Sequence, residues 1–241
     1  MTPDMEKPSR IFIERLRNLN KANKSTSTDR FFKSHEAKGG NAIDATKTAV
    51  LLIEYQNEFT TEGGKLHGAV KQIMESNGML AKSADVARVA RDAGCKIFHA
   101  PISFAEDASD NPNKGLGILA GCAADKLFTT GSWNADFCDS MKPAAGDIVV
   151  KGKKGLDAFP GTDLEANLKA NGIETIALGG FLTNCCVEST MRTAYEKGFN
   201  VVTLTDCTAT TSQKGQDAAT QETYTMFSQP LTAADFIAKV K

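Results

Sequence analysis

The stretch IETIALGGFLTNCCVESTMRTAY, residues 173–195, contains the change from strand to helix that decides how this chain folds. Residues 173–178 have the pattern of a buried strand that stops at two glycines. Apolar and small side chains then repeat at helical spacing over residues 187–194. Cys186 is therefore expected to lie where the helix begins. The unpaired amides and positive dipole end of a helix N-terminus stabilise a thiolate, so Cys186 is a candidate nucleophile.

The neighbouring Cys185 is a competing candidate. Free cysteines are more often inert core residues than nucleophiles, and successive residues at a helix start point in different directions. At most one of the two thiols is expected to face a pocket, and their spacing alone does not choose between them.

Two further strand ends carry charged residues. The apolar run TAVLLI at residues 48–53 is followed directly by Glu54, and a short strand at 147–150 leads into the cluster Lys151, Lys153 and Lys154. Ligands bind at the carboxyl ends of the strands in open parallel sheets. The carboxylate, a lysine and the cysteine are thus expected to converge on one crevice.

Apolar runs and helical patterns alternate along the chain in an order that predicts a parallel sheet. We expect a three-layer αβα sandwich around a central, mainly parallel, Rossmann-like sheet. Strands are expected near residues 48–53, 95–100, 147–151, 173–178 and 200–205, and helices near 69–93, 161–171, 186–197, 213–226 and 233–240. Residues 105–122 are expected to form a long loop, either a cover over the active site or a surface excursion. Trp133 is expected in the core.

These segments resemble the isochorismatase-like cysteine hydrolase family, which includes nicotinamidases, N-carbamoylsarcosine amidases and isochorismatases. The resemblance extends over about residues 48–240. It rests on three ordered motifs, I-D-x-Q-x-x-F, K-x-x-x-S-A-F-x-G-T-x-L and G-x-x-T-x-x-C-V-x-x-T. The matching residues are Ile53, Gln56 and Phe59 in the first, Ala158, Phe159, Gly161, Thr162 and Leu164 in the second, and Gly180, Thr183, Cys186, Val187 and Thr190 in the third.

The motifs select among the candidates and also show two departures. The third motif selects Cys186 over Cys185. Counting back from the aromatic residue of the second motif selects Lys153, although this loop differs in length by one residue and Lys151 is the second choice. Glu54 stands where the family has aspartate, so its extra methylene must be absorbed by the backbone or the rotamer.

The resemblance implies a catalytic site with Glu54 as general base, Lys153 as its cationic partner and Cys186 as nucleophile. It also implies a cis peptide bond between Phe181 and Leu182, and an oxyanion hole formed by the backbone amides of Leu182 and Cys186. Aromatic side chains that we expect to contact substrate are Phe59, Phe104 and Phe159.

The implied reaction is cleavage of an amide or carbamoyl carbon–nitrogen bond of a small metabolite through a cysteine thioester. The first alternative is isochorismate hydrolysis, which releases pyruvate and needs an acid but no nucleophile. The second is a catalytically silent interaction protein in which Glu54 marks a decayed site.

No metal or other cofactor is expected. Nicotinamidases bind a metal through a D-x-H motif and a further histidine, but the histidines here are His35, His67 and His99, and none lies in such a motif. His99 follows an apolar run at a strand end, where it serves either as a structural residue or as a pocket residue.

Composition limits the classes of partner. The chain has 241 residues, of which 41% are hydrophobic, and a formal net charge of -1. It has no basic face for nucleic acid and no apolar run near the roughly 20 residues that span a bilayer. The six cysteines lack the spacing of a metal site or a disulfide framework, which favours a reducing compartment. We expect a cytoplasmic enzyme that acts on a small-molecule substrate. The resemblance leaves open that the protein is exported without a recognisable signal.

Residues 1–45 are expected to form an N-terminal extension to a hydrolase domain at 46–241. The extension is mostly polar and lacks the apolar region of a secretory signal. It nevertheless contains apolar residues at Ile11, Phe12, Ile13, Leu16, Leu19, Phe31 and Phe32. We expect it to pack on its own domain or across a subunit interface, because the resembled family commonly forms homo-oligomers, dimers or tetramers.

Overall fold

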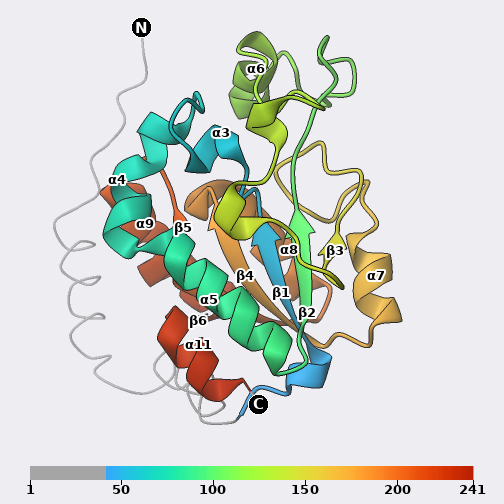
Figure 1. Ribbon diagram of the computed structural model, residues 1–241, viewed down its shortest axis with the longest axis vertical. Helices are drawn as coiled ribbons and strands as arrows, with labels where there is room; N and C mark the ends of the chain where they lie inside the picture. The colour runs from blue at the N-terminus through green and yellow to red at the C-terminus, as the bar shows by residue number, and fades with distance from the viewer. Residues whose placement is uncertain (1–41, 241) are drawn as a thin grey trace, which may run out of the picture. The chain divides into compact units, whose positions relative to one another are not determined.

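A six-stranded parallel sheet is the centre of the computed structural model, which describes residues 42–240 (Figure 1). The predictions for the N-terminal extension fall almost wholly outside the described residues. The strand order is β3-β2-β1-β4-β5-β6. The strands are β1 (Thr48–Ile53), β2 (Lys96–Ala100), β3 (Ile148–Val149), β4 (Thr175–Phe181), β5 (Asn200–Ala209) and β6 (Gln229–Leu231).

Helices cover both faces of this sheet, which confirms the predicted three-layer α/β architecture. Figure 1 shows α5 crossing in front of the strands. One face is covered by α4 (His67–Asn77), α5 (Met79–Asp92) and α11 (Ala233–Lys239), and the other by α7 (Leu164–Ala170), α8 (Glu188–Glu196) and α10 (Tyr224–Phe227). The remaining α-helices are α3 (Asn57–Thr60), α6 (Gly117–Ala124) and α9 (Gln213–Ala218). No helix among the described residues has the length and apolar character to cross a membrane.

The central position of β1 in the sheet explains why its sequence is a continuous apolar run. Every residue of this strand is buried. Val50 and Leu52 pack into the cluster that contains α4, α5 and α11, whereas Leu51 and Ile53 pack into the cluster on the opposite face. Successive side chains of a strand point to opposite faces, so a central strand with helices on both sides needs apolar residues at every position.

The structure corrects the predicted helix boundaries. The helix expected over 69–93 is two helices, α4 and α5, because Gly78 adopts a left-handed conformation with φ of 61° and ends the first one. The helix expected over 213–226 is interrupted by a π-helical turn at Ala219–Thr223. The last helix, α11, is capped by Thr232, whose hydroxyl accepts from the Asp235 amide at 3.1 Å.

Three expectations about elements were wrong. Strand β6 was missed because three residues, one of them a proline, are too short for a periodic pattern and occupy a sheet edge, where proline is tolerated. Helix α6 begins within the segment 105–122 that was expected to be loop, because its glycines masked the helix. Trp133 was expected in the core, but its side chain is 50% exposed in a short 3-10 helix.

The two central strands approach closely where β4 passes the end of β1. A Cβ atom at Gly180 would lie 2.0 Å from the carbonyl oxygen of Ile53, and the φ of Gly180 is 136°. Only glycine combines this backbone conformation with such a close approach. Gly180 therefore fixes the spacing between the end of β1 and the segment that follows β4.

The substitution Gly180→Ala should lower the free energy of unfolding by about 3 kcal/mol or more, because a backbone atom of β1 must move. Gly198→Ala is the matched control: it also has a positive φ, of 84°, but its Cβ would meet nothing within 4 Å. That variant should lose only about 1 kcal/mol. Denaturant titration of both variants measures the difference, and equal losses would contradict the close-contact explanation.

His99 of β2 has a structural setting. Its Nε2 lies 3.0 Å from Asp147 Oδ2, and Arg91 from α5 donates to both oxygens of the same carboxylate, at 2.9 and 2.8 Å. Burial lowers the pKa of His99 below its ordinary value of 6.5, and the hydrogen bond to Asp147 opposes this only in part. His99 is therefore neutral in the folded protein at a pH where an unfolded histidine takes up a proton.

The depressed pKa of His99 predicts a loss of stability in acid. The unfolded chain binds more protons than the folded one as the pH falls below 6.5, so the free energy of unfolding declines there. His99→Gln retains a neutral N–H donor for Asp147 and should reduce the decline measured by denaturation at about pH 7 and about pH 5. His67→Gln is the control, and an equal decline in wild type and His99→Gln would refute the assignment.

Candidate active site

The predicted catalytic side chains follow three strands of the sheet. Glu54 comes directly after β1, Lys153 follows β3, and Cys186 follows β4. Strands β1 and β4 are neighbours at the centre of the sheet, where the strand order reverses. Crevices in open parallel sheets form at this point, outside the carboxyl ends of the strands.

Glu54 and Lys153 form a buried ion pair. Both side chains are almost fully inaccessible, and Lys153 Nζ bonds to Glu54 Oε1 and also donates to the carbonyl oxygen of Gly155 at 2.7 Å. Burial opposes the charge of Lys153, but the Glu54 carboxylate outweighs this effect and leaves the pKa of Lys153 above its ordinary value. The structure places Lys151, the second choice from the sequence, on the exposed surface.

The backbone on both sides of this pair is tightly constrained. Glu54 has a φ of 59°, a left-handed conformation that few non-glycine residues adopt. Gly152 has a φ of 89°, and a Cβ there would lie 2.5 Å from the carbonyl oxygen of Gly161. The Asp163 carboxylate also accepts from the Lys151 amide at 2.8 Å. The loop after β3 is therefore held in a shape that directs Lys153 inward.

Cys186 lies in a π-helical turn, Thr183–Val187, that leads into α8. The Thr190 hydroxyl donates to the carbonyl oxygen of Cys186 at 2.8 Å and accepts from the Ala158 amide at 3.0 Å. One hydroxyl thus connects the cysteine turn to the lysine loop. Thr190, the last residue of the cysteine motif, therefore has a structural role.

The first residue of the turn is also anchored to the C-terminal part of the domain. Thr183 donates through its hydroxyl to Gln216 Oε1 at 2.6 Å, and its carbonyl oxygen accepts from the Tyr224 hydroxyl at 2.8 Å. The Asn184 side chain accepts from Thr210 at 2.6 Å. These bonds hold the turn at a fixed place beside the end of β1.

The adjacent thiols of Cys185 and Cys186 influence each other's pKa. Their mutual hydrogen bond raises the pKa of Cys186 and lowers that of Cys185, and burial together with the Glu54 carboxylate raises the pKa of Cys186 further. Lys153 lowers it, but its charge is largely compensated by Glu54. We therefore place a protonated thiol at Cys186 in the resting protein. A nucleophile in this state needs a base, and Glu54 is the neighbouring carboxylate.

A cavity of about 270 Å³ opens beside these residues, and both Glu54 and Cys186 line it. Phe59 and Leu182, which were expected at the substrate and oxyanion positions, also border it, and the peptide bond between Phe181 and Leu182 is cis. Two expected substrate contacts lie elsewhere. Phe104 and Phe159 are buried in the cores on opposite faces of the sheet, because each anchors a loop rather than facing the cavity.

Sequence reasoning missed the wall of this cavity that is formed by residues 118–128. Figure 1 shows α6 beyond the arrowheads of β1 and β2. Leu119 and Cys122 from α6, with Leu127 and Phe128 after it, line the cavity. The sequence signal for this wall is the long, glycine-rich segment at 105–122. Its pattern is consistent with either a cover over the active site or a surface excursion. The described structure shows a helix there that borders the cavity.

The buried Glu58 carboxylate fixes this wall. It accepts from the Asn134 side chain and the Lys65 amide, each at 2.5 Å, and from the Phe128 amide at 3.4 Å. Gln56 similarly fixes the part of the wall that Ile102 forms. Its side-chain amide donates to the carbonyl oxygen of Ile102 at 2.8 Å and accepts from the Ile102 amide at 2.9 Å. The residues around α3 thus position apolar side chains in the cavity.

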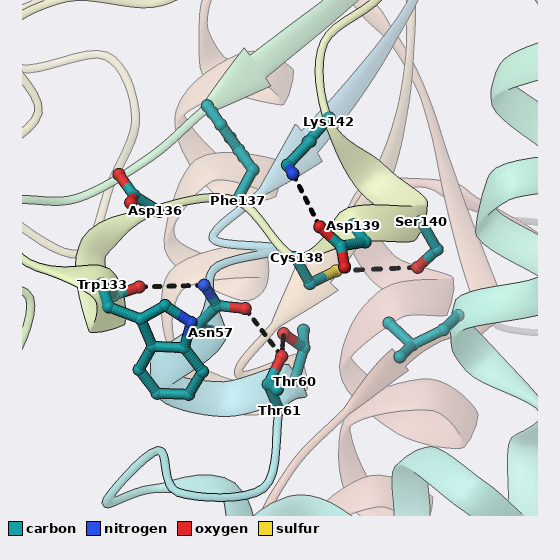
Figure 2. Close-up of a pocket in the computed structure, with 11 residues that line it drawn as sticks. Asn57, Thr60, Thr61, Trp133, Asp136, Phe137, Cys138, Asp139, Ser140 and Lys142 are labelled. Carbon is teal, nitrogen blue, oxygen red and sulfur yellow. Dashed lines mark hydrogen bonds and ion pairs between the residues drawn. The ribbon is translucent and has the colours of Figure 1, made fainter.

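A second cavity, of about 550 Å³, lies on the other side of α3 (Figure 2). Asn57 and Thr61 face it, and their side chains bond to each other at 2.7 Å, while Asn57 also donates to the carbonyl oxygen of Trp133 at 2.9 Å. Lys142 pairs with Asp139 at 2.6 Å. The polar groups that line this second cavity are largely used for bonds to one another. None of the three predicted catalytic side chains lines it.

Comparison with known proteins decides the family. The sequence model of the Isochorismatase domain matches residues 48–235, which is most of the chain. The chain belongs to the isochorismatase family. It is a hydrolase of the isochorismatase-like cysteine hydrolase type, and the predicted relationship is confirmed.

Within the part of the chain that the structure describes, no group of three or more His, Cys, Asp or Glu side chains is placed to hold a metal ion.

Two of the relatives are named as ureidoacrylate amidohydrolases. A ureidoacrylate amidohydrolase from Variovorax paradoxus is 29% identical over 208 residues, which covers 81% of this chain and 82% of the relative. One from Methylorubrum extorquens is 29% identical over 178 residues, covering 69% and 71%.

Solved structures share the fold. A cysteine hydrolase from Pseudomonas syringae pv. phaseolicola superposes with a TM-score of 0.72 at 22% identity, covering 82% of this chain and 94% of that one. An N-carbamoylsarcosine amidase from Thermoplasma acidophilum has a TM-score of 0.63 at 22% identity, covering 78% and 96%.

The ion pair predicts a specific response to removal of the lysine. Lys153→Met removes the cation that lowers the pKa of the Cys186 thiol, so this pKa should rise and the acidic limb of the rate profile should move to higher pH. The free energy of unfolding should fall by on the order of 3 kcal/mol. Lys151→Met, on the surface, is the matched control. A shifted limb in Lys151→Met and an unshifted limb in Lys153→Met would reverse the assignment.

Proposed function

We propose that this protein hydrolyses an amide or carbamoyl carbon–nitrogen bond of a small metabolite through a thioester on Cys186. The observation that carries the proposal is the buried Glu54–Lys153 pair beside a buried cysteine at the wall of a largely apolar cavity. The relatives named as amidohydrolases support the same class of bond.

The reaction begins with proton transfer from the Cys186 thiol to the Glu54 carboxylate. The sulfur then forms a bond to the carbonyl carbon of the substrate, whose oxygen becomes an oxyanion. Glu54 returns the proton to the nitrogen as the carbon–nitrogen bond breaks, so the amine leaves neutral and a thioester remains. Water attacks the thioester, Glu54 takes its proton, and the acid is released as the thiol is restored.

Each remaining group has a part in this sequence. Lys153 pairs with the buried Glu54 carboxylate and compensates its charge, and this carboxylate is the proposed base. The backbone amides of Leu182 and Cys186 are the proposed donors to the oxyanion, and both residues border the cavity beside the sulfur. Donors that are fixed before the reaction stabilise the developing charge without reorganisation.

The presence of the thiol in the cavity favours this route over isochorismate hydrolysis, which needs an acid but no nucleophile. The two reactions differ in their dependence on the cysteine. The Glu54→Gln variant should lose activity whichever of the two reactions the protein catalyses, because both reactions use the carboxyl group for proton transfer.

The decisive variant is Cys186→Ala, which should lower the rate of amide hydrolysis by about three orders of magnitude or more while the fold persists. Cys185→Ala is the matched control and should retain measurable turnover. Ammonia release and far-ultraviolet circular dichroism measure activity and folding. Substantial amidase turnover by folded Cys186→Ala would overturn the thioester mechanism, and isochorismate turnover that survives in this variant would favour the isochorismatase alternative. A wild-type protein that turns over neither class would favour the silent interaction protein.

A further inference from the structure

The walls of the active-site cavity are almost entirely hydrocarbon. Apart from the reacting residues, the large buried side chains that line it are hydrocarbon: Phe59, Val70, Ile102, Leu119, Leu127, Phe128 and Leu182. The Cys122 thiol is the one further buried heteroatom group among the described lining side chains. Apolar walls stabilise a ligand by removing its hydrocarbon from water, and they penalise any polar group that loses water without gaining a partner. The deep part of this cavity therefore favours an apolar acyl group.

The charges around the cavity are unfavourable for an anion. The charged side chains among the lining residues are Glu54 and Asp125, both acidic, and no lysine, arginine or histidine is among the described residues that line it. Lys153 lies behind Glu54, with its side chain fully inaccessible and bonded to that carboxylate. A substrate carboxylate would lose water, meet like charge and find no cationic partner.

Cations near the mouth are engaged elsewhere. The Lys65 ammonium group donates to the main-chain carbonyl oxygen of Asp125 at 2.5 Å. The Lys154 ammonium group pairs with Asp110 at 2.7 Å and donates to the carbonyl oxygen of Ser103 at 2.6 Å. Neither lysine lines the cavity.

We infer that the substrate is a neutral amide whose acyl group is small and apolar, and that the site selects against a carboxylate on that group. This inference rests on the proposed amide hydrolysis and deepens it. A cavity of about 270 Å³ limits the ligand to on the order of ten non-hydrogen atoms. The chain then differs from the relatives named for ureidoacrylate, because acrylate is a carboxylate.

Binding to the Cys186→Ala protein tests the ligand class without turnover. The probes are pentanamide and glutaramate, which share the amide and the three adjacent methylene groups but end in a methyl group and a carboxylate, respectively. Pentanamide should bind at least about tenfold more tightly by calorimetry or ligand-observed NMR. Equal or tighter binding of glutaramate, or no binding of either compound, would overturn the inference.

A charge-insertion variant tests the electrostatic basis at the same site. Ile118 lines the mouth of the cavity and is 50% exposed, so Ile118→Lys should fold and bring a cation to the ligand. It should shift the preference toward glutaramate by about tenfold. Leu116→Lys is the matched control, because Leu116 is 74% exposed on the same segment but does not line the cavity. An unchanged preference in Ile118→Lys, or an equal shift in the control, would overturn selection by charge.

Failure of this inference is distinct from failure of the proposed reaction. If wild-type protein releases no ammonia from pentanamide while the Cys186→Ala protein binds pentanamide in preference to glutaramate, the hydrolysis is contradicted and the ligand class is supported. If wild-type protein hydrolyses glutaramate faster than pentanamide, the hydrolysis is supported and the ligand class is overturned.

Discussion

The close approach of β1 and β4 is the constraint on which the site depends. Gly180 allows the two central strands to meet at the carbonyl oxygen of Ile53, and the chain on either side then presents Glu54 and the Cys186 turn at the same edge of the sheet. A side chain at that glycine would separate the two strand ends. The arrangement of the proposed catalytic residues is thus a consequence of how tightly the sheet packs at the point where its strand order reverses.

The buried ion pair sets the electrostatics of this edge. A carboxylate and an ammonium group that are both removed from water must compensate each other, or one of them must lose its charge. Because Lys153 is committed to Glu54, it lowers the pKa of Cys186 less than burial, the Cys185 hydrogen bond and the carboxylate together raise it. The site therefore combines a base with a protonated thiol. The position of Cys186 at a helix start would by itself predict a preformed thiolate instead.

The apolar cavity follows from the elements that close over this edge. Helix α3 directs Phe59 toward the cavity and Asn57 toward the second cavity, and Glu58 holds the backbone of Phe128 in place. Polar groups in these segments bond to one another behind the wall, so hydrocarbon remains facing the reacting residues. The same helix thus separates the apolar cavity beside Glu54 and Cys186 from a more polar cavity that the exposed Trp133 lines.

The sequence by itself determined the layers of the fold and the order of the three motif segments. Runs such as residues 48–53 report burial on both faces directly, because a central parallel strand needs apolar side chains at every position. Strand order and connection rules then bring the residues after β1, β3 and β4 to one edge. Only the tertiary structure shows that Lys153 pairs with Glu54 while Lys151 is exposed, because a one-residue difference in loop length is absorbed by backbone angles that no pattern reveals. It likewise decided the cavity wall, since Phe104 and Phe159 turn into the cores while α6 supplies side chains from a segment with no clear periodicity. Local patterns record what each segment buries, whereas the surface that a loop presents to a cavity depends on contacts with residues far away in the chain.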